Sequence, residues 1–406
     1  MTVVRRCVLV KKARTLILSF FFPPCTDGAS TLMHNLCNYL PREDYAVITT
    51  QEEFGLHCWN DLGIHDKEYA LDCDAIRLPV KMNRIQDRIR FFLLAVLEGV
   101  LFNAKEGIGC VLAVYPDEFD IFGAYFLRYL TGRPIVIYMH DLFSETRVGT
   151  KGYRLWKFVE EKIFASASVI LVTNEIFKKH YEKRGIKNVR VLPSCVDLSS
   201  SVPKVAFQEK ETTSHEKLRI VYTGSIYAAN EDAIISFINA SKKVNDVEVV
   251  FCTPYSRDYL EGINVGFLPK KECQRLQEDA DVLFLPLSFR SSYSDEIKCA
   301  FPCKSLEYLA AGKPVLAVVP EKSYMEELIE GNGVGIVVTE LSERKIADAI
   351  ELLKDEKKRK CFSKNARETA RKFDSAIQTK RLLSIIEYAA SDKLKERKVK
   401  NRHHRN

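Results

Sequence analysis

Long apolar runs are absent from this chain of 406 residues. The longest, Phe91–Leu97, is ended by Glu98 and falls well short of the roughly 18 apolar residues that a membrane-spanning helix needs. A secretory leader is not expected either, because Thr15–Phe22 is followed by Pro23 and Pro24 and not by a small-residue cleavage site. We therefore interpret Thr15–Phe22 as a first β-strand and expect no membrane span.

Paired cysteines are absent as well. The 12 cysteines include no Cys-x-x-Cys motif, and the closest two are Cys299 and Cys303. Zinc sites and disulfide frameworks need tighter clusters, so we expect reduced, mostly buried thiols and a cytoplasmic location. A hydrophobic fraction of 46% over this length is sufficient for two domains with complete cores.

The net charge of +7 is concentrated at the two ends of the chain. Residues 1–14 hold five basic side chains and no acidic one, and residues 391–406 hold seven basic against two acidic. The body between them is slightly acidic, whereas a nucleic-acid-binding protein carries its basic surface on the fold itself. We therefore expect no nucleic-acid partner and predict that 391–406 is a solvated, disordered tail, with anionic lipid as the alternative partner of the basic ends.

Strand-like and helix-like segments alternate in two runs, separated by a serine-rich linker at 199–217. Such alternation is typical of parallel sheets covered by helices on both faces. Strands are predicted at Thr15–Phe22, Tyr45–Thr50, Ile108–Val114, Pro134–Met139, Ser168–Thr173 and Val189–Leu192, then at Leu218–Tyr222, Val247–Cys252, Ile263–Phe267, Val282–Leu287 and Val315–Val319. The sequence therefore predicts an α/β protein with two Rossmann-like domains, 1–198 and 218–373, that face each other across a cleft.

The most informative segment is Phe301–Ala317. Pro302 can open a helix and Gly312 can close it. Lys304 and Glu307 are three residues apart, so they share one face of that helix. A helix N-terminus with an ammonium group suits a diphosphate, and a carboxylate one turn later suits a ribose diol. The alternative is a solvated ion pair worth roughly 0.2–0.5 kcal/mol.

Phe301–Ala317 closely resembles the donor-site helix of the group 1 retaining glycosyltransferases, nucleotide-sugar enzymes of GT-B fold, and the similarity extends over most of the chain. The resemblance implies transfer of a sugar, with retention of configuration, from a nucleotide diphosphate to a glycan or lipid-linked acceptor in cell-surface polysaccharide synthesis. It implies no metal and no cofactor besides the nucleotide sugar. It also implies Lys304 and Ser305 at the phosphates, Glu307 at the ribose, and closing helices within 374–390 that cross back onto the first domain.

Two turns of the first domain resemble ligand-binding turns of this family. Gly28 follows the first strand and, by resemblance, lies beneath the donor phosphate or the acceptor; a plain turn with Ser30 as helix N-cap fits equally well. His140 and Asp141 follow the strand Pro134–Met139, at the end where such sheets bind ligands. They are similar to the family's sugar contact, and we assign His140 to a sugar hydroxyl rather than to a general base.

In the second domain, Gly224 and Ser225 follow the strand Leu218–Tyr222 and resemble the family's phosphate-binding loop. The family usually has cations soon after that glycine, and this loop has none. Charge compensation for the diphosphate is then expected from Lys304, Arg290 or Lys298, or from helix N-termini. A turn without a ligand is the alternative.

Phe267 and Leu268 lie in a turn that resembles the family's nucleobase-binding turn. Backbone groups near these two residues would contact the base. An apolar turn that binds nothing is the alternative, and the sequence barely separates the two.

The chain departs from the family at Cys299, where a Glu-x7-Glu motif commonly has its first acid. Asp295 and Glu296 lie nearby and are candidate substitutes. Two alternatives therefore stay open: a GT-B binding subunit without catalysis, and a GT-B sugar-nucleotide epimerase. The Asp-x-Asp triplets at 72–74 and 279–281 are interpreted as solvated turn acids rather than as metal sites.

The segment Lys81–Leu94 begins basic and becomes apolar. A helix of this kind can lie on an anionic membrane surface at the acceptor side. It can equally be a core helix with a charged first turn. The expected location is the cytoplasm, with peripheral attachment to the inner face of the membrane as a further alternative.

Overall fold

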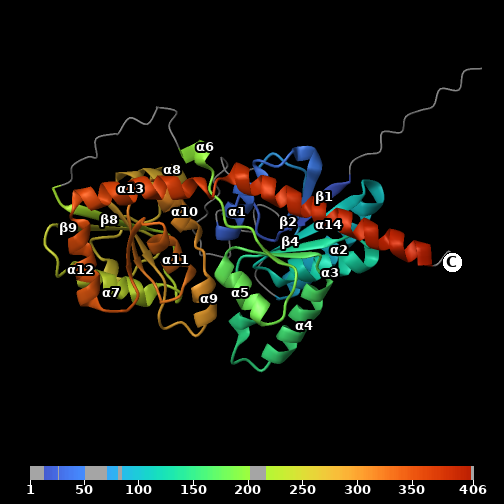
Figure 1. The fold of residues 1–406 in the computed structure, drawn as a ribbon, viewed down its shortest axis with the longest axis horizontal. Helices are drawn as coiled ribbons and strands as arrows, with labels where there is room; N and C mark the ends of the chain where they lie inside the picture. The colour runs from blue at the N-terminus through green and yellow to red at the C-terminus, as the bar shows by residue number, and fades with distance from the viewer. Residues whose placement is uncertain (1–12, 26, 51–70, 81–84, 202–215, 404–406) are drawn as a thin grey trace, which may run out of the picture.

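The computed structural model describes residues 13–25, 27–50, 71–80, 85–201 and 216–403. The chain forms two α/β domains that lie side by side, each built on its own parallel sheet (Figure 1). The predicted fold class, two Rossmann-like domains, is confirmed. Of the helices among the described residues, none has the combined length and apolar character of a membrane span.

The N-terminal sheet has seven parallel strands in the order β3-β2-β1-β4-β5-β6-β7. Its strands are β1 (Arg14–Leu18), β2 (Tyr45–Thr50), β3 (Ala75–Leu78), β4 (Ile108–Tyr115), β5 (Ile135–Met139), β6 (Val169–Val172) and β7 (Val189–Val191). Central strands are apolar and buried, because helices cover both faces. The strand order reverses between β1 and β4, and open α/β sheets bind ligands at the carboxyl ends beside such a reversal.

Two helical layers cover this sheet. One consists of α2 (Ile85–Lys105), α3 (Glu118–Thr131), α4 (Tyr153–Ser166) and α5 (Glu175–Lys183). The other consists of α1 (Gly28–Cys37) and α14 (Ser375–His403). Leu382 and Ala389 of α14 are fully buried in the same cluster as Leu36 of α1, so the last helix completes the N-terminal core. This is the crossing that the resemblance implies.

The C-terminal sheet has five parallel strands in the order β12-β11-β10-β8-β9. They are β8 (Leu218–Thr223), β9 (Val247–Cys252), β10 (Val282–Pro286), β11 (Val315–Val318) and β12 (Gly335–Val338). The helices are α7 (Glu231–Ser241), α8 (Lys270–Asp279), α9 (Ser294–Cys299), α10 (Cys303–Ala310), α11 (Tyr324–Gly331), α12 (Glu343–Leu353) and α13 (Glu356–Arg371). Helices α7 and α12 pack on one face, and α10, α11 and α13 on the other.

Three short elements escaped the sequence analysis, and one predicted strand is wrong. Strands β3 and β12 are four residues long with one buried residue each, and α9 is a six-residue helix, so none carries a strong periodic signal. The predicted strand Ile263–Phe267 is a loop with one isolated bridge to β9. Gly262 and Gly266 have φ values of 77° and 80°, which interrupt extended backbone there.

The C-terminal basic segment differs from its prediction. Helix α14 continues to His403, so residues 391–403 are helical and not a disordered tail. The segment is rich in good helix formers and contains no glycine or proline. The predicted linker begins with α6 (Leu198–Ser201), and its part at 202–215 lies outside the described residues.

The acids of both Asp-x-Asp triplets are held by arginines. Asp74 Oδ2 lies 2.6 Å from Arg14 Nη1, and Asp279 Oδ2 lies 3.0 Å from Arg219 Nη1. Asp74 and Asp279 are 51% and 41% exposed, so they are solvated acids, as predicted, and each also pairs with an arginine near the start of a central strand.

Candidate functional site

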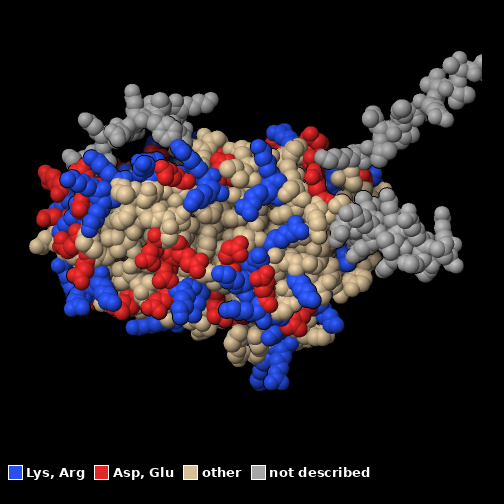
Figure 2. All heavy atoms as spheres, in the orientation of Figure 1, with Lys and Arg blue, Asp and Glu red and all other residues tan. Residues whose placement is uncertain are grey.

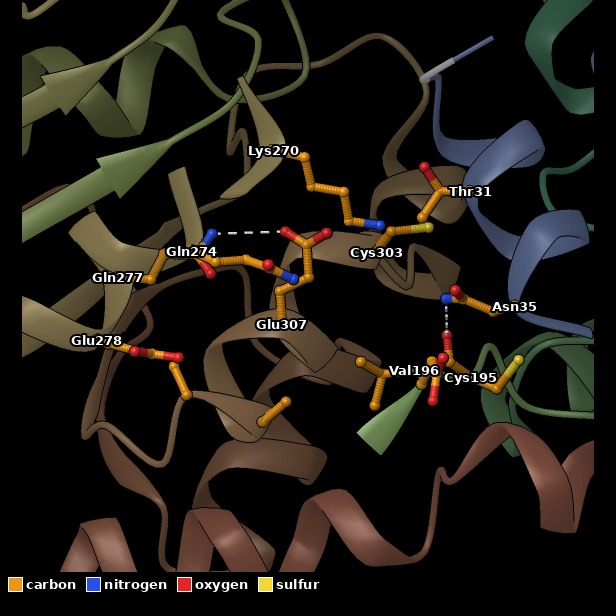
Figure 3. A pocket seen from close by; sticks show the side chains of 13 residues that line it. Thr31, Asn35, Cys195, Val196, Lys270, Gln274, Gln277, Glu278, Cys303 and Glu307 are labelled. Atoms are coloured by element: carbon orange, nitrogen blue, oxygen red, sulfur yellow. Dashed lines mark hydrogen bonds between the residues drawn. The ribbon is translucent and has the colours of Figure 1, made fainter. Parts of the chain in front are cut away.

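A pocket opens between the two domains (Figure 3). It encloses about 630 Å³, counting space open to solvent. Helix α1 and the segment after β7 form one side, and helices α8 and α10 form the other. Its lining residues are Thr31, Asn35, Cys195, Val196, Asp197, Lys270, Gln274, Gln277, Glu278, Cys303, Glu307, Ala310 and Ala311.

Helix α10 bears the predicted phosphate and ribose contacts. It starts after Pro302, and among the described residues no side chain caps its first turn. Leu306 and Leu309 are buried in the domain core and fix the helix in place. The helix ends before Gly312, whose φ is 66°, as the sequence predicts. The uncapped N-terminus leaves backbone N–H groups that suit an anionic ligand.

The side chain of Lys304 lies against the end of β8. Its Nζ donates to Tyr222 Oη at 2.8 Å and lies 4.2 Å from the centroid of that ring. A Cβ added at Gly224, where φ is 119°, would lie 2.8 Å from the same Nζ. Two residues predicted from separate motifs, Lys304 and Gly224, are therefore in contact. The alternative of a solvated pair between Lys304 and Glu307 is wrong, because the ammonium group is buried against Tyr222.

Burial lowers the pKa of Lys304 to about 7, and the nearby charge of Glu307 only partly opposes this. The ammonium group is desolvated, and no carboxylate among the described residues lies within ion-pairing distance of it. A diphosphate beside Lys304 would supply the missing counter-charge. The site is therefore electrostatically prepared for an anion.

The Glu307 carboxylate lies in the pocket and is held from α8. Gln277 Nε2 donates to Glu307 Oε2 at 3.4 Å and to Thr223 Oγ1 at 2.9 Å. Tyr308 Oη in turn accepts from the Thr223 backbone N–H at 3.0 Å. Gln277 is 1% exposed and was missed by the sequence analysis, because nothing in its own neighbourhood marks it. Gln277 of α8 therefore orients the acid, and Thr223 of β8 in turn orients Gln277.

The two predicted serines have different roles from those expected. Ser225 contributes its carbonyl, which accepts from Tyr222 Oη at 2.5 Å and from Asn230 Nδ2 at 3.0 Å. The Ser305 hydroxyl is buried and donates to the Pro302 carbonyl at 2.7 Å. Ser225 therefore shapes the loop under Lys304, and Ser305 closes the first turn of α10.

The predicted base-binding turn leads directly into α8. Phe267 is 41% exposed. Two residues after Leu268, Lys270 begins α8 and lines the pocket near Glu307 (Figure 3). Lys270 is the cation that the sequence analysis missed. Its position at a helix start directly after this turn was the available signal.

Helix α1 meets α10 at the pocket. The Cys303 thiol donates to the Gly28 carbonyl at 3.3 Å, which places Gly28 between the domains. The N-cap of α1 is Asp27 and not Ser30: Asp27 Oδ1 accepts from the N–H groups of Ala29 at 2.9 Å and Ser30 at 3.0 Å. The start of α1 is therefore already occupied by a carboxylate.

His140 and Asp141 follow β5, as predicted. Burial lowers the pKa of His140 to about 3, so the ring is neutral, and its Nε2 has no hydrogen-bond partner among the described residues. Burial raises the pKa of Asp141 to about 6. The charge of Asp141 also acts on Tyr227 and Glu296 of the other domain, so it faces the gap between the domains. A neutral, unpartnered imidazole is suited to a hydroxyl contact.

Cys299, which takes the place of the family's first acid, belongs to the N-terminal core. It is buried in that cluster, and its carbonyl accepts from Asn174 Nδ2 at 2.7 Å. Glu296, one turn earlier on α9, has a buried Oε2 without a hydrogen-bond partner in the described part of the chain. Burial, with the charge of Asp141, raises the pKa of Glu296 to about 8. Glu296 is therefore the acid that α9 presents to Asp141.

Two other candidate residues lie elsewhere. Arg290 is exposed, its backbone N–H donates to Asp232 at 3.0 Å, and it does not line the pocket. Asp295 is exposed on α9. The structure does not bring either residue to Lys304, because both lie on the solvent side of the segment between β10 and α10.

A buried charge network supports the segment after Asp141. Arg184 Nη1 lies 2.6 Å from Glu145 Oε1, and the same guanidinium group also pairs with Glu160. His180 Nε2 lies 2.9 Å from Glu145 Oε1. The network joins α4 and α5 to the short helix η4 (Glu145–Arg147), which follows Asp141. It holds the loop that carries His140 and Asp141.

Two family models match the sequence, one in each domain. "Glycosyltransferase Family 4" matches residues 26–200, and "Glycosyl transferases group 1" matches residues 261–369. The second match contains the whole of α8 and α10, which supply Lys270, Lys304 and Glu307. A comparison with curated proteins finds no match.

Solved structures with the same fold span nearly the whole chain. Sucrose-phosphate synthase from Thermosynechococcus elongatus is 16% identical with a TM-score of 0.68, covering 93% of this chain and 100% of that one. HepE of Anabaena, solved in complex with UDP-glucose, is 14% identical with a TM-score of 0.67, covering 92% and 99%. A putative UDP-N-acetylglucosamine 2-epimerase from Listeria monocytogenes is 12% identical with a TM-score of 0.61, covering 94% and 97%.

Proposed function

Because this chain belongs to the group 1 glycosyltransferases of GT-B fold, we propose that it moves a sugar from a nucleotide diphosphate to a glycan or lipid-linked acceptor, with retention of configuration and without a metal ion. The observation that carries the proposal is the contact of Gly224 with Lys304, on the same helix whose Glu307 lines the interdomain pocket. A role in cell-surface polysaccharide synthesis is part of the same proposal.

Charged side chains and backbone N–H groups bind the donor. The diphosphate lies at the uncapped start of α10, with Lys304 and Lys270 as its cations, and the ribose hydroxyls bind the Glu307 carboxylate. The base lies over the turn at Phe267 and Leu268. The similarity to HepE, which was solved with UDP-glucose, supports a nucleotide sugar as the donor class.

The transfer step needs charge stabilisation more than a strong base. The acceptor hydroxyl oxygen bonds to the anomeric carbon on the face that the diphosphate leaves, while the bond from that carbon to the phosphate oxygen breaks. The acceptor's proton passes to the leaving phosphate oxygen. Lys304 and the N–H groups of α10 stabilise the charge that develops on the diphosphate.

The sugar lies toward the N-terminal domain. His140 is neutral over the whole working range of pH and contacts a sugar hydroxyl, which agrees with its unpartnered Nε2. Glu296 is largely protonated at neutral pH and can donate a hydrogen bond to a sugar oxygen beside Asp141. Glu296 thereby takes the place of the acid that Cys299 lacks.

Two other functions remain as alternatives. A non-catalytic binding subunit is suggested by Cys299, although His140, Lys304 and Glu307 are all retained. A sugar-nucleotide epimerase is suggested by the likeness to the Listeria protein, a putative UDP-N-acetylglucosamine 2-epimerase.

The test is a thermal-shift screen with UDP, GDP, ADP and their sugars, followed by product analysis. We expect one nucleotide class to raise the melting temperature by mass action. Glu307→Ala is expected to abolish that shift and to lower kcat/KM by about 100-fold, the loss of two charge-assisted hydrogen bonds. Glu330→Ala, an exposed acid on α11, is the matched control.

Each outcome separates the alternatives. Hydrolysis or transfer products with the donor's anomeric configuration, read by NMR, support the retaining transferase. A nucleotide shift without any turnover favours the binding subunit, and interconversion of the donor sugar without transfer favours the epimerase. No shift with any nucleotide overturns the donor site.

A further inference from the structure

Exposed apolar side chains are distributed unevenly over the described residues. Eleven of the nineteen exposed large hydrophobic residues lie between positions 85 and 158. Single exposed apolar residues are ordinary, but a contiguous patch marks a binding surface. The apolar face, as we define it, consists of Ile85, Ile89, Leu93, Leu97, Leu101, Phe126, Tyr129, Leu130, Val148, Leu155 and Phe158.

Five members of the apolar face form one row along α2. They recur every fourth residue from Ile85 to Leu101 and are 44% to 61% exposed. At 1.5 Å per residue the row is about 24 Å long. The core side of the same helix is formed by other residues, including Phe91, Ala95 and Phe102. The five residues of the row therefore do not contribute to the core of the domain.

The row continues onto the neighbouring helices. The ring of Phe126 on α3 lies 5.3 Å from that of Phe92 on α2, which joins the first two helices. Phe122 of α3 stacks on Trp156 of α4 at 6.0 Å, which joins the second and third. Helices α2, α3 and α4 lie on the same side of the N-terminal sheet, so their exposed apolar residues form one surface.

The charges around the apolar face are mostly positive. Over residues 85–166, the exposed charged residues are one acid, Glu161, and five bases, Arg90, Lys105, Lys151, Arg154 and Lys162. Basic side chains dominate the lower tip of the N-terminal domain in Figure 2, where α4 begins. Other acids of this region are wholly or partly buried, as in the pairing of Arg88 with Glu118. The exposed surface therefore complements a negative partner.

We propose that the apolar face docks on a bilayer that contains anionic lipid. The row on α2 and the aromatic residues of α3 and α4 would lie among the acyl chains, and the exposed bases would lie at the headgroups. A second copy of the chain is a poorer occupant, because a two-fold contact would set the same five exposed cations against one another.

Docking there would bring the membrane close to the acceptor side of the pocket. The segment from His140 and Asp141 to the start of α4 contains only the short helix η4, so the sugar contacts and the apolar face belong to one domain. A lipid-linked acceptor then reaches the pocket from the bilayer. This last point rests on the proposed function, whereas the docking itself does not.

The test is flotation of the full chain with vesicles of phosphatidylcholine alone and with phosphatidylglycerol added. We expect the wild type to float with the anionic vesicles and the double variant Leu93→Glu, Leu97→Glu to lose binding by at least about tenfold. The matched control is Leu352→Glu, a 49% exposed leucine on α12, which should float like the wild type. A far-UV circular dichroism spectrum and a cooperative melting transition like those of the wild type show that the double variant is folded.

Three results would overturn the proposal. The first is that the wild type does not float with anionic vesicles. The second is that the double variant floats as well as the wild type, which would mean that the basic ends alone bind lipid. The third is that light scattering shows a wild-type dimer that the double substitution disrupts. If no nucleotide raises the melting temperature of the wild type, the proposed donor site is wrong, but the flotation result still stands. The two proposals can therefore fail separately.

Discussion

In the C-terminal domain, helix α10 starts at Pro302 without a side-chain cap, whereas in the N-terminal domain α1 starts with the Asp27 carboxylate on its N–H groups. The two helices meet through Cys303 and Gly28. Both starts carry the partial positive charge of a helix dipole, but one of them already holds an anion. The N-terminus of a helix in a Rossmann-like domain is therefore not always free to bind an anionic ligand. Whether it is free depends on whether an acidic residue already caps it.

The two domains also differ in where they keep charge. In the N-terminal domain, Arg184 pairs with Glu160 in the interior, where the carboxylate side chain is fully buried. In the C-terminal domain, Arg219 pairs with Asp279, whose side chain is 41% exposed. The first network supports the sugar-side loop, and the second only ties a strand start to a helix end. The depth of a charge pair should thus decide how much its loss costs.

The largest expected difference comes from Arg184→Leu against Arg219→Leu. Removal of Arg184 leaves the buried acids Glu145 and Glu160 without their cation, so we expect a loss of about 3–5 kcal/mol in unfolding free energy. Arg219→Leu should cost about 1 kcal/mol or less, because its partners are screened by water. Urea unfolding of both variants measures the difference, and equal losses would contradict it.

A smaller effect is expected from Gly224→Ala against Gly262→Ala. Both glycines have positive φ, so both variants should lose about 1–2 kcal/mol of stability through backbone strain. Only at Gly224 does the new Cβ approach Lys304 Nζ, whereas at Gly262 it meets nothing within 4 Å. We expect the Kd for the nucleotide sugar, measured by calorimetry, to rise roughly tenfold in Gly224→Ala alone. Equal affinities of the two variants would remove Lys304 from the donor site.

The affinity for the nucleotide sugar should fall as pH rises from 7 to 9. The pKa of Lys304 is about 7 in the free protein, and a bound diphosphate raises it, so binding takes up a proton. The loss can reach about tenfold per pH unit above 7, and the donor's own phosphates do not titrate in this range. Lys304→Arg keeps its charge and should give a flat profile. A sloping Lys304→Arg profile would assign the effect to another group.

The smallest effect is expected from Glu296→Gln. The folded-state pKa of Glu296, about 8, lies above its ordinary value of 4.5, so its favourable contribution is complete below pH 4.5 and is lost as pH rises through 8. The wild type should therefore lose melting temperature between pH 5.5 and 8.5, and the variant should lose about 2–4 °C less. Glu330→Gln is the exposed control. Parallel slopes for all three proteins would place Glu296 in solvent.

Sequence periodicity predicted nearly every long element, since helix and strand spacing are local properties. It also placed Lys304 and Glu307 on one helix between Pro302 and Gly312, as found. It failed where signals are short or non-local. Gln277 and Glu145 have no feature in their own segments that marks them, and Lys270 was overlooked although it directly follows the predicted base-binding turn.

The sequence by itself determined the two α/β domains and the spacing of the donor-site helix, because hydrophobic period, proline and glycine act within a few residues of themselves. Only the tertiary structure decided that Lys304 contacts Tyr222, that Cys299 of α9 is buried while Glu296 faces Asp141, and that α2 exposes a row of isoleucine and leucine side chains. Those outcomes depend on which surfaces remove each other from water. Desolvation is a property of the assembled fold and not of any one segment.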